Sequence, residues 1–259
     1  KVPEENKAVI KELSARGVEI VIATGRRYYS AKEFVSRLDM TPIIMANNGS
    51  IVRDMKDDSL LVTRYFEDDD FYSVIGEGKD RGLDAITHVD YFSEGYDIII
   101  EREKNDKRYS NYLRDIANRY RTIDDMLKHS DPRALAVIYT GELERLKEFY
   151  NNLNSQYKGK YNAYMMYNLK DVGAMLEIIH SKTSTWLSIL DYASQKGIDK
   201  SEIVAIGDDN NDMEMIKNAG FGIAMKNATE EVKSVSDMIT TRTNDESGLG
   251  YALKEVFKL

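Results

Sequence analysis

Carboxylate and amide side chains are concentrated in the segment GDDNND at 207–212. The apolar run 203–206 precedes it and the helix-like MEMIKNAG follows, so a buried strand is predicted to end in a loop that carries Asp208 and Asp212. Open α/β sheets bind ligands at the carboxyl ends of their strands, and oxygen-rich clusters suit a hard cation such as Mg²⁺. The alternative is a polar loop that caps the next helix, since Asp and Asn are common N-caps.

Three further segments place polar side chains at predicted strand ends or at a helix start: TGR at 24–26, NNG at 47–49, and Lys182. The first offers a hydroxyl, an unobstructed backbone and a cation, which are groups that hold a phosphate. Each segment also has an ordinary interpretation. The threonine can be an N-cap, Asn-Asn-Gly is a turn signal, and most lysines are solvated surface residues.

Taken together, these segments resemble the haloacid dehalogenase (HAD) superfamily, specifically its Cof-type (HAD-IIB-like) phosphatases. The family's second motif, a strand ending in Thr-Gly-Arg, is matched by VIATGR, and its third, a lysine after the inserted cap, by Lys182 in LEIIHSKTS. Its fourth, Gly-Asp-x-x-Asn-Asp-x-x-Met, is matched at 207–215. The tail is similar through GFGIAMKNA at 220–228 and ESGLG at 246–250. The fourth motif with this tail is the most specific part of the resemblance.

The resemblance implies a role for each matching residue. Thr24 would hydrogen-bond the transferring phosphoryl group, and Lys182 would neutralise charge on that group and on the nucleophile. Asp208 would bind Mg²⁺ directly, and Asp212 would bind it through water or orient the ligands around it. The remaining matching residues would contact the substrate and its phosphate: Gly25, Arg26, Asn48 and Asn211.

The implied activity is Mg²⁺-dependent hydrolysis of a small phosphorylated metabolite, such as a sugar phosphate, through an aspartyl-phosphate. Two alternatives stay open. One is a non-catalytic HAD-like domain that binds a phosphate ligand or a partner, and the other is a sugar-phosphate phosphomutase.

The family's first motif, Asp-x-Asp-x-(Thr/Val), supplies the nucleophile and the acid/base, and it does not occur in the printed chain. The chain starts at KVPEEN, which is similar to family sequence just after that motif, and Asp68–Asp70 reads better as a solvated helix start. We therefore expect about 20 further residues upstream, including a central strand without which two inner sheet edges would be unpaired.

Composition narrows the function classes. A net charge of -8 without a long basic run makes nucleic acid an unexpected partner, and the absence of cysteine removes thiolate metal sites and cysteine nucleophiles. No apolar run reaches the length of a membrane span, and no signal-peptide pattern is present, so we expect a cytoplasmic protein with no membrane partner. The three histidines lack metal-ligand spacing and are expected in structural or surface roles.

The elements that position these residues follow two patterns. Near both ends of the chain, short apolar runs alternate with helical periodicity, as in a parallel sheet. The middle is rich in tyrosine and reads as an α+β region with a sheet of its own. Its strand-like pieces are 83–88, 96–101, 134–140 and 161–167; a helix opens at 67–70, and further helical stretches lie at about 108–120 and 142–156. We therefore predict an α/β fold in which a Rossmann-like parallel-sheet core, 1–69 and 178–259, is interrupted by an inserted α+β cap, 70–177.

Overall fold

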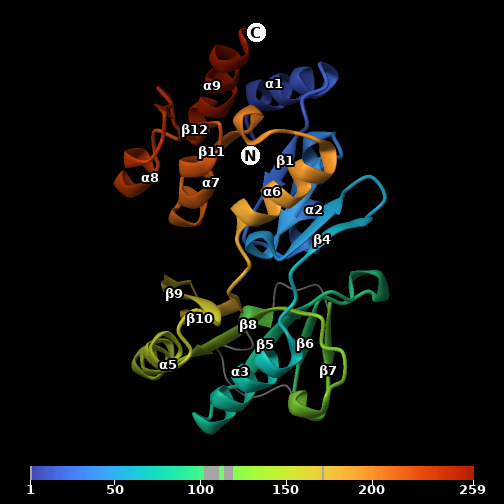
Figure 1. Ribbon diagram of the computed structural model, residues 1–259, viewed down its shortest axis with the longest axis vertical. Helices are drawn as coiled ribbons and strands as arrows, with labels where there is room; N and C mark the ends of the chain where they lie inside the picture. The colour runs from blue at the N-terminus through green and yellow to red at the C-terminus, as the bar shows by residue number, and fades with distance from the viewer. Residues whose placement is uncertain (1, 102–110, 114–118, 171) are drawn as a thin grey trace. The chain divides into compact units, whose positions relative to one another are not determined.

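The computed structural model describes residues 2–101, 111–113, 119–170 and 172–259, which form two compact units (Figure 1). Unit 1 combines Lys1–Val62 with Ser184–Leu259, and unit 2 is Thr63–Thr183. Unit 2 is thus an insertion between two halves of unit 1. The boundaries expected from the sequence, 69/70 and 177/178, both fall inside unit 2.

Unit 1 contains two separate sheets, with strand orders β1-β2-β3-β4 and β11-β12-β13. β1 and β2 pair in parallel, as do the three strands of the second sheet, whereas β2 and β3 are antiparallel. These parallel pairs confirm the predicted α/β class. The strands are β1 (Val21–Ala23), β2 (Ile43–Ala46), β3 (Ile51–Asp54), β4 (Leu60–Thr63), β11 (Val204–Gly207), β12 (Phe221–Ala224) and β13 (Met238–Ile239).

β1 and β11 each form an edge of their sheet, with no hydrogen-bonded neighbour on one side among the described residues. Both strands border the same apolar clusters, since Ala23 and Ile206 pack against one cluster, and Ile206 and Ile20, the residue before β1, pack against another. All three residues of β1 are only partly buried, whereas all of β2 is buried. Unit 1 therefore has two incompletely covered inner edges, which is unusual for strands beside a hydrophobic core.

Helix α6 connects the two sheets of unit 1. Its Trp186 packs with β11 and β12, and its Tyr192 packs with β2 and β3. Helix α1 starts after Pro3 and buries Val9 and Leu13 against α9. The helices of unit 1 are α1 (Glu4–Ala15), α2 (Tyr28–Val35), α6 (Thr185–Lys196), α7 (Met213–Asn218), α8 (Glu230–Ser234) and α9 (Gly248–Phe257).

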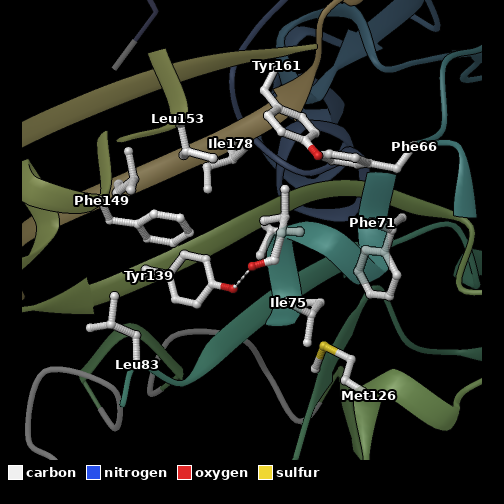
Figure 2. Close-up of a cluster of buried hydrophobic side chains, with 14 of the residues drawn as sticks. Phe66, Phe71, Ile75, Leu83, Met126, Tyr139, Phe149, Leu153, Tyr161 and Ile178 are labelled. Atoms are coloured by element: carbon white, nitrogen blue, oxygen red, sulfur yellow. Dashed lines mark hydrogen bonds between the residues drawn. The ribbon is translucent and has the colours of Figure 1, made fainter. Parts of the chain in front are cut away.

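Unit 2 is built on a six-stranded sheet in the order β7-β6-β5-β8-β10-β9. Its neighbours are antiparallel except for the pair β6 and β7. Figure 2 shows its main apolar cluster, in which the Tyr139 hydroxyl donates to the Val74 carbonyl at 3.0 Å. The elements are α3 (Asp68–Asp80), β5 (Ala85–Val89), β6 (Ile98–Ile100), β7 (Tyr120–Thr122), β8 (Ala134–Gly141), α5 (Leu143–Gln156), β9 (Tyr161–Leu169) and β10 (Gly173–His180).

The sequence predicted most of these elements but missed three strands, β7, β10 and β13. β7 and β13 are only three and two residues long, too short for a periodic pattern. The helix expected at about 108–120 falls partly outside the described residues; 111–113 is helical and Tyr120 begins β7. None of the described helices combines the length and apolar character needed to cross a bilayer.

Candidate active site

The Thr-Gly-Arg segment is a turn directly after β1. The Thr24 amide still pairs with the Met45 carbonyl of β2 at 2.9 Å, and the Thr24 hydroxyl oxygen accepts the Arg26 amide at 3.2 Å. Thr24 therefore does not cap a helix with this hydroxyl; it closes a local turn of the kind Ser and Thr favour. Arg26 is exposed, and Thr24 and Gly25 are partly buried.

The Asn-Asn-Gly segment lies against that turn, at the end of β2. The Asn47 amide donates to the Arg26 carbonyl at 2.9 Å and the Asn48 amide to the Thr24 carbonyl at 3.2 Å. Asn47 and Asn48 have φ values of 49° and 52°, which Asn tolerates better than most residues. The turn interpretation is confirmed, and the two turns are joined through their backbones.

The Asn48 side chain faces the glycine of the first turn. A Cβ added at Gly25 would lie 3.0 Å from Asn48 Oδ1, so a larger residue there would press on the amide. Gly49, with φ of 90°, packs closely on the start of α6, where an added Cβ would lie 2.6 Å from the Ser184 carbonyl oxygen. Contact with the Asn48 side chain therefore explains Gly25, and positive φ with close backbone approach explains Gly49.

The acidic segment forms the loop after β11, as predicted. Asp212 Oδ2 accepts the Asp208 amide at 3.0 Å and the Asp209 amide at 3.3 Å, so this carboxylate folds back over the strand end. An added Cβ at Gly207 would lie 2.5 Å from Asp212 Cγ, which shows why glycine precedes the loop. Helix α7 begins at Met213, immediately after these contacts.

The two carboxylates have different surroundings. Asp208 is exposed, and one of its oxygens, Oδ2, accepts the Asn227 side-chain amide at 3.1 Å. Asp212 is partly buried, and burial raises its pKa above the ordinary value, although the two backbone donors oppose that shift. A bound cation would favour the ionised form of Asp212 by charge compensation.

The donor set of this loop fits Mg²⁺. No group of three or more His, Asp or Glu side chains gathers at a possible metal site in the part of the chain described here. Mg²⁺ is, however, commonly held by one or two carboxylates together with water and substrate phosphate. Among the described residues, no group donates a hydrogen bond to Asp208 Oδ1. This oxygen is therefore available to a cation. Asn211 is exposed on the same loop.

Lys182 lies in unit 2, in a turn three residues before α6 begins, so the expectation that it opens the helix is wrong. Ser184 is the N-cap of α6; its hydroxyl accepts the Leu187 amide. The exposed Lys182 follows β10, and its backbone amide donates to His180 Nδ1 at 3.1 Å. Convergence of Lys182 with Thr24 and Asn211, which belong to unit 1, stays a prediction.

Asn162 on β9 also holds the turn that carries Lys182, called the lysine turn below. Its side-chain amide donates to the carbonyls of Ser181 and Thr183 at 3.2 and 3.1 Å. Burial lowers the pKa of His180, which favours the neutral imidazole that can accept the Lys182 amide. The structural role predicted for His180 is to accept the backbone amide of Lys182. The role of Asn162 was not predicted from the sequence.

Asn227 is the second residue that sequence analysis left without a role, although it belongs to the quoted tail GFGIAMKNA. Its contact with Asp208 spans 19 residues. Asp68–Asp70 behaves as expected, since it forms the first turn of α3 in unit 2, where Asp70 pairs with Lys160 at 2.7 Å.

Comparison with known proteins gives similar chains over the full length. The 5-amino-6-(5-phospho-D-ribitylamino)uracil phosphatase YitU of Bacillus subtilis is 27% identical over 273 residues, covering 100% of this chain and 92% of its own length. The phosphatase YwpJ of the same organism is 24% identical, covering 97% and 92%. A haloacid dehalogenase-like hydrolase from Bacteroides thetaiotaomicron has a similar crystal structure, with a TM-score of 0.81, 23% identity and coverage of 99% and 93%.

The family comparison agrees with the motifs. The model of the haloacid dehalogenase-like hydrolases matches residues 1–253, which include both the Thr-Gly-Arg turn and the acidic loop. The chain therefore belongs to the haloacid dehalogenase-like hydrolase family, as the resemblance of its motifs predicted.

Proposed function

We propose that this protein is a Mg²⁺-dependent phosphatase that hydrolyses a small phosphorylated metabolite through an aspartyl-phosphate. The observation that carries the proposal is the loop after β11, where Asp212 closes the turn and Asp208 presents a carboxylate held at one oxygen only. The names of YitU and YwpJ as phosphatases support the same reaction class. A cytoplasmic location without nucleic-acid or membrane partners remains part of the proposal.

Each residue has a defined task in the proposed reaction. Thr24 donates its hydroxyl to the transferring phosphoryl group, and Lys182 compensates charge on that group. Gly25, Arg26, Asn48 and Asn211 surround the phosphate and the remainder of the substrate. Mg²⁺, bound by Asp208 and oriented with the help of Asp212, supplies charge compensation for the phosphoryl oxygens.

The covalent steps require two further carboxylates. One aspartate attacks phosphorus while a second protonates the leaving oxygen, and water then hydrolyses the acyl phosphate with the second aspartate as base. We propose that both belong to an Asp-x-Asp motif on a strand that pairs with β1 and β11. The partly exposed inner edges of β1 and β11 support this, because a strand pairing there would end beside Thr24 and Asp208.

Phosphate release by the full-length protein tests the proposal. The panel should include sugar phosphates, p-nitrophenyl phosphate and, because YitU is named for one, a phosphorylated ribityl compound. We expect Mg²⁺-dependent turnover, a loss of about 100-fold or more in Asp208→Asn, and near-normal rates in the matched variant Asp209→Asn. The Asp209 side chain accepts the local Asn210 amide and forms a capping box with Asp212, and Asn at this position keeps an oxygen that can accept both backbone amides.

The other outcomes separate the alternatives. Binding of phosphate ligands without turnover would favour the non-catalytic domain. Transfer of the phosphoryl group to a second position on the same sugar would favour the phosphomutase. Equal rates with and without Mg²⁺ would remove the metal from the mechanism.

A further inference from the structure

Asn227 connects the acidic loop to a distant part of unit 1. It lies in the loop between β12 and α8, on the protein surface. Its Nδ2 donates to Asp208 Oδ2 at 3.1 Å, and its Oδ1 accepts the Asn244 backbone amide at 3.0 Å. Since a backbone N–H can only donate, the Asn244 contact determines the amide orientation and leaves Nδ2 for the carboxylate.

The loop that carries Asn227 is itself attached to the acidic loop. The Met225 amide donates to the Gly207 carbonyl at 2.9 Å and the Thr229 amide to the Asp208 carbonyl at 3.3 Å. The Thr229 hydroxyl also donates to Asn210 Oδ1 at 3.0 Å. Residues before and after Asn227 are therefore hydrogen-bonded to residues 207–210, and these bonds place Asn227 beside Asp208.

We propose that Asn227 is a positioning residue for the reaction, which holds the Asp208 carboxylate so that Oδ1 alone faces the cation. This inference rests on the proposed function. A neutral amide occupies one carboxylate oxygen without neutralising the ligand, and it restricts rotation of the carboxylate plane. Hydrogen-bond partners of metal ligands commonly change metal affinity by about 10–100-fold when removed.

The test compares four forms of the full-length protein: unaltered, Asn227→Ala, Asn218→Ala and Asp208→Asn. Asn218 is the control, because its side-chain Nδ2, like that of Asn227, donates one hydrogen bond, but to the Glu214 carbonyl at 2.8 Å and not to Asp208. Mg²⁺ affinity is measured by calorimetry well below the melting temperature of each form. We expect about tenfold or greater weakening in Asn227→Ala, no change in Asn218→Ala and no binding by Asp208→Asn.

A merely structural role predicts a different pattern. It would lower the melting temperature of Mg²⁺-free Asn227→Ala while leaving Mg²⁺ affinity unchanged, and that result would overturn the inference. Asn227→Ser, which lacks the reach to join Asp208 and Asn244, should reproduce the weakening and replaces the alanine variant if that one unfolds. If the unaltered protein binds no Mg²⁺, or Asp208→Asn binds it normally, the proposed function fails and this inference with it.

Discussion

The two units differ most in how their sheets are completed. In unit 2, β8 has hydrogen-bonded neighbours on both sides, and its first seven residues are buried. In unit 1, β1 is partly exposed throughout, and Ala205 is the one buried residue of β11. The strand β8 of unit 2 is thus paired on both sides and buried, while β1 and β11 of unit 1 lie at sheet edges and are largely only partly buried. The polar turns expected to do the chemistry follow those same two strands.

Unit 1 carries Thr24 and Asp208, two residues of the proposed site, directly after strands that lie at sheet edges. Strands β1 and β11 border the same apolar clusters but share no hydrogen bonds; each pairs with one neighbour only, β1 with β2 and β11 with β12. Lys182 belongs to unit 2, where the end of β10 and the Asn162 side chain hold its turn.

The largest expected effect concerns the open edges at β1 and β11. A polypeptide of residues 1–259 alone should release no phosphate above background, because the Asp-x-Asp-x-(Thr/Val) motif expected to accept the phosphoryl group does not occur in its sequence. Addition of a native upstream strand with Asp-x-Asp should restore turnover to enzymatic rates, about 1 s⁻¹ or more. Phosphate release from the panel above is the measurement.

Replacing the first aspartate of that strand by Asn should abolish the restored activity. Turnover at enzymatic rates by the 259-residue polypeptide, confirmed by mass, would show that the open edges need no added strand for catalysis. Asp68 and Asp70 would then have to be reconsidered.

The next largest effect concerns a buried carboxyl group in the six-stranded sheet of unit 2. Burial raises the pKa of Glu177, on β10, to about 7. The folded protein therefore binds this proton more tightly than the unfolded chain, and the free energy of unfolding should fall as pH rises from about 4.5 to 7, by about 3 kcal/mol in total. Glu177→Gln should remove that fall and be the more stable form at pH 8.

Urea unfolding at pH 5 and pH 8 checks the sign. The two proteins should differ little at pH 5, and Glu177→Gln should be more stable at pH 8. The single Trp186 lies in unit 1, so its fluorescence follows that unit, and hydrogen exchange of β8 follows unit 2. A variant with the same pH dependence as the unaltered protein would contradict the assignment.

A smaller effect is expected from overpacking the same core. A Cβ at Gly78 on α3 would overlap the Tyr139 hydroxyl and lie 2.5 Å from Cζ of that buried ring. Gly78→Ala should destabilise unit 2 by about 1–3 kcal/mol. Gly76→Ala on the same helix meets nothing within 4 Å and should stabilise it by about 0.5–1 kcal/mol. Equal effects of the two substitutions on β8 exchange would show that the Tyr139 contact is not tight.

The smallest predicted effect concerns the lysine turn. Asn162→Ala removes both side-chain bonds to the turn, and if Lys182 compensates phosphoryl charge, kcat should fall by up to about tenfold with Mg²⁺ affinity unchanged. Asn154→Ala, which removes one bond within α5, is the control. Steady-state kinetics and calorimetry give the two readouts. An unchanged kcat would mean that the turn does not depend on Asn162 for its position.

Local features of the site could be predicted because local residue types decide them. The Asn-Asn-Gly turn followed from residues that tolerate positive φ, and the acidic loop from an apolar run that stops at Gly207. Asn227 and Asn162 could not be found this way, since their contacts join residues 17 to 21 positions apart. Strand β10 was not predicted, because its apolar run 175–179 was interpreted only as the segment that precedes Lys182.

The sequence by itself determined the α/β class, the insertion of a second unit and the polar turns after β1, β2 and β11. Hydrophobic periodicity and turn chemistry are short-range properties, and one chain segment contains them in full. Only the tertiary structure decided which strands pair, which inner edges stay open, that Lys182 belongs to unit 2, and that Asn227 holds Asp208. Those outcomes depend on contacts between distant segments, whose residue types allow many partners until packing and hydrogen bonding select one.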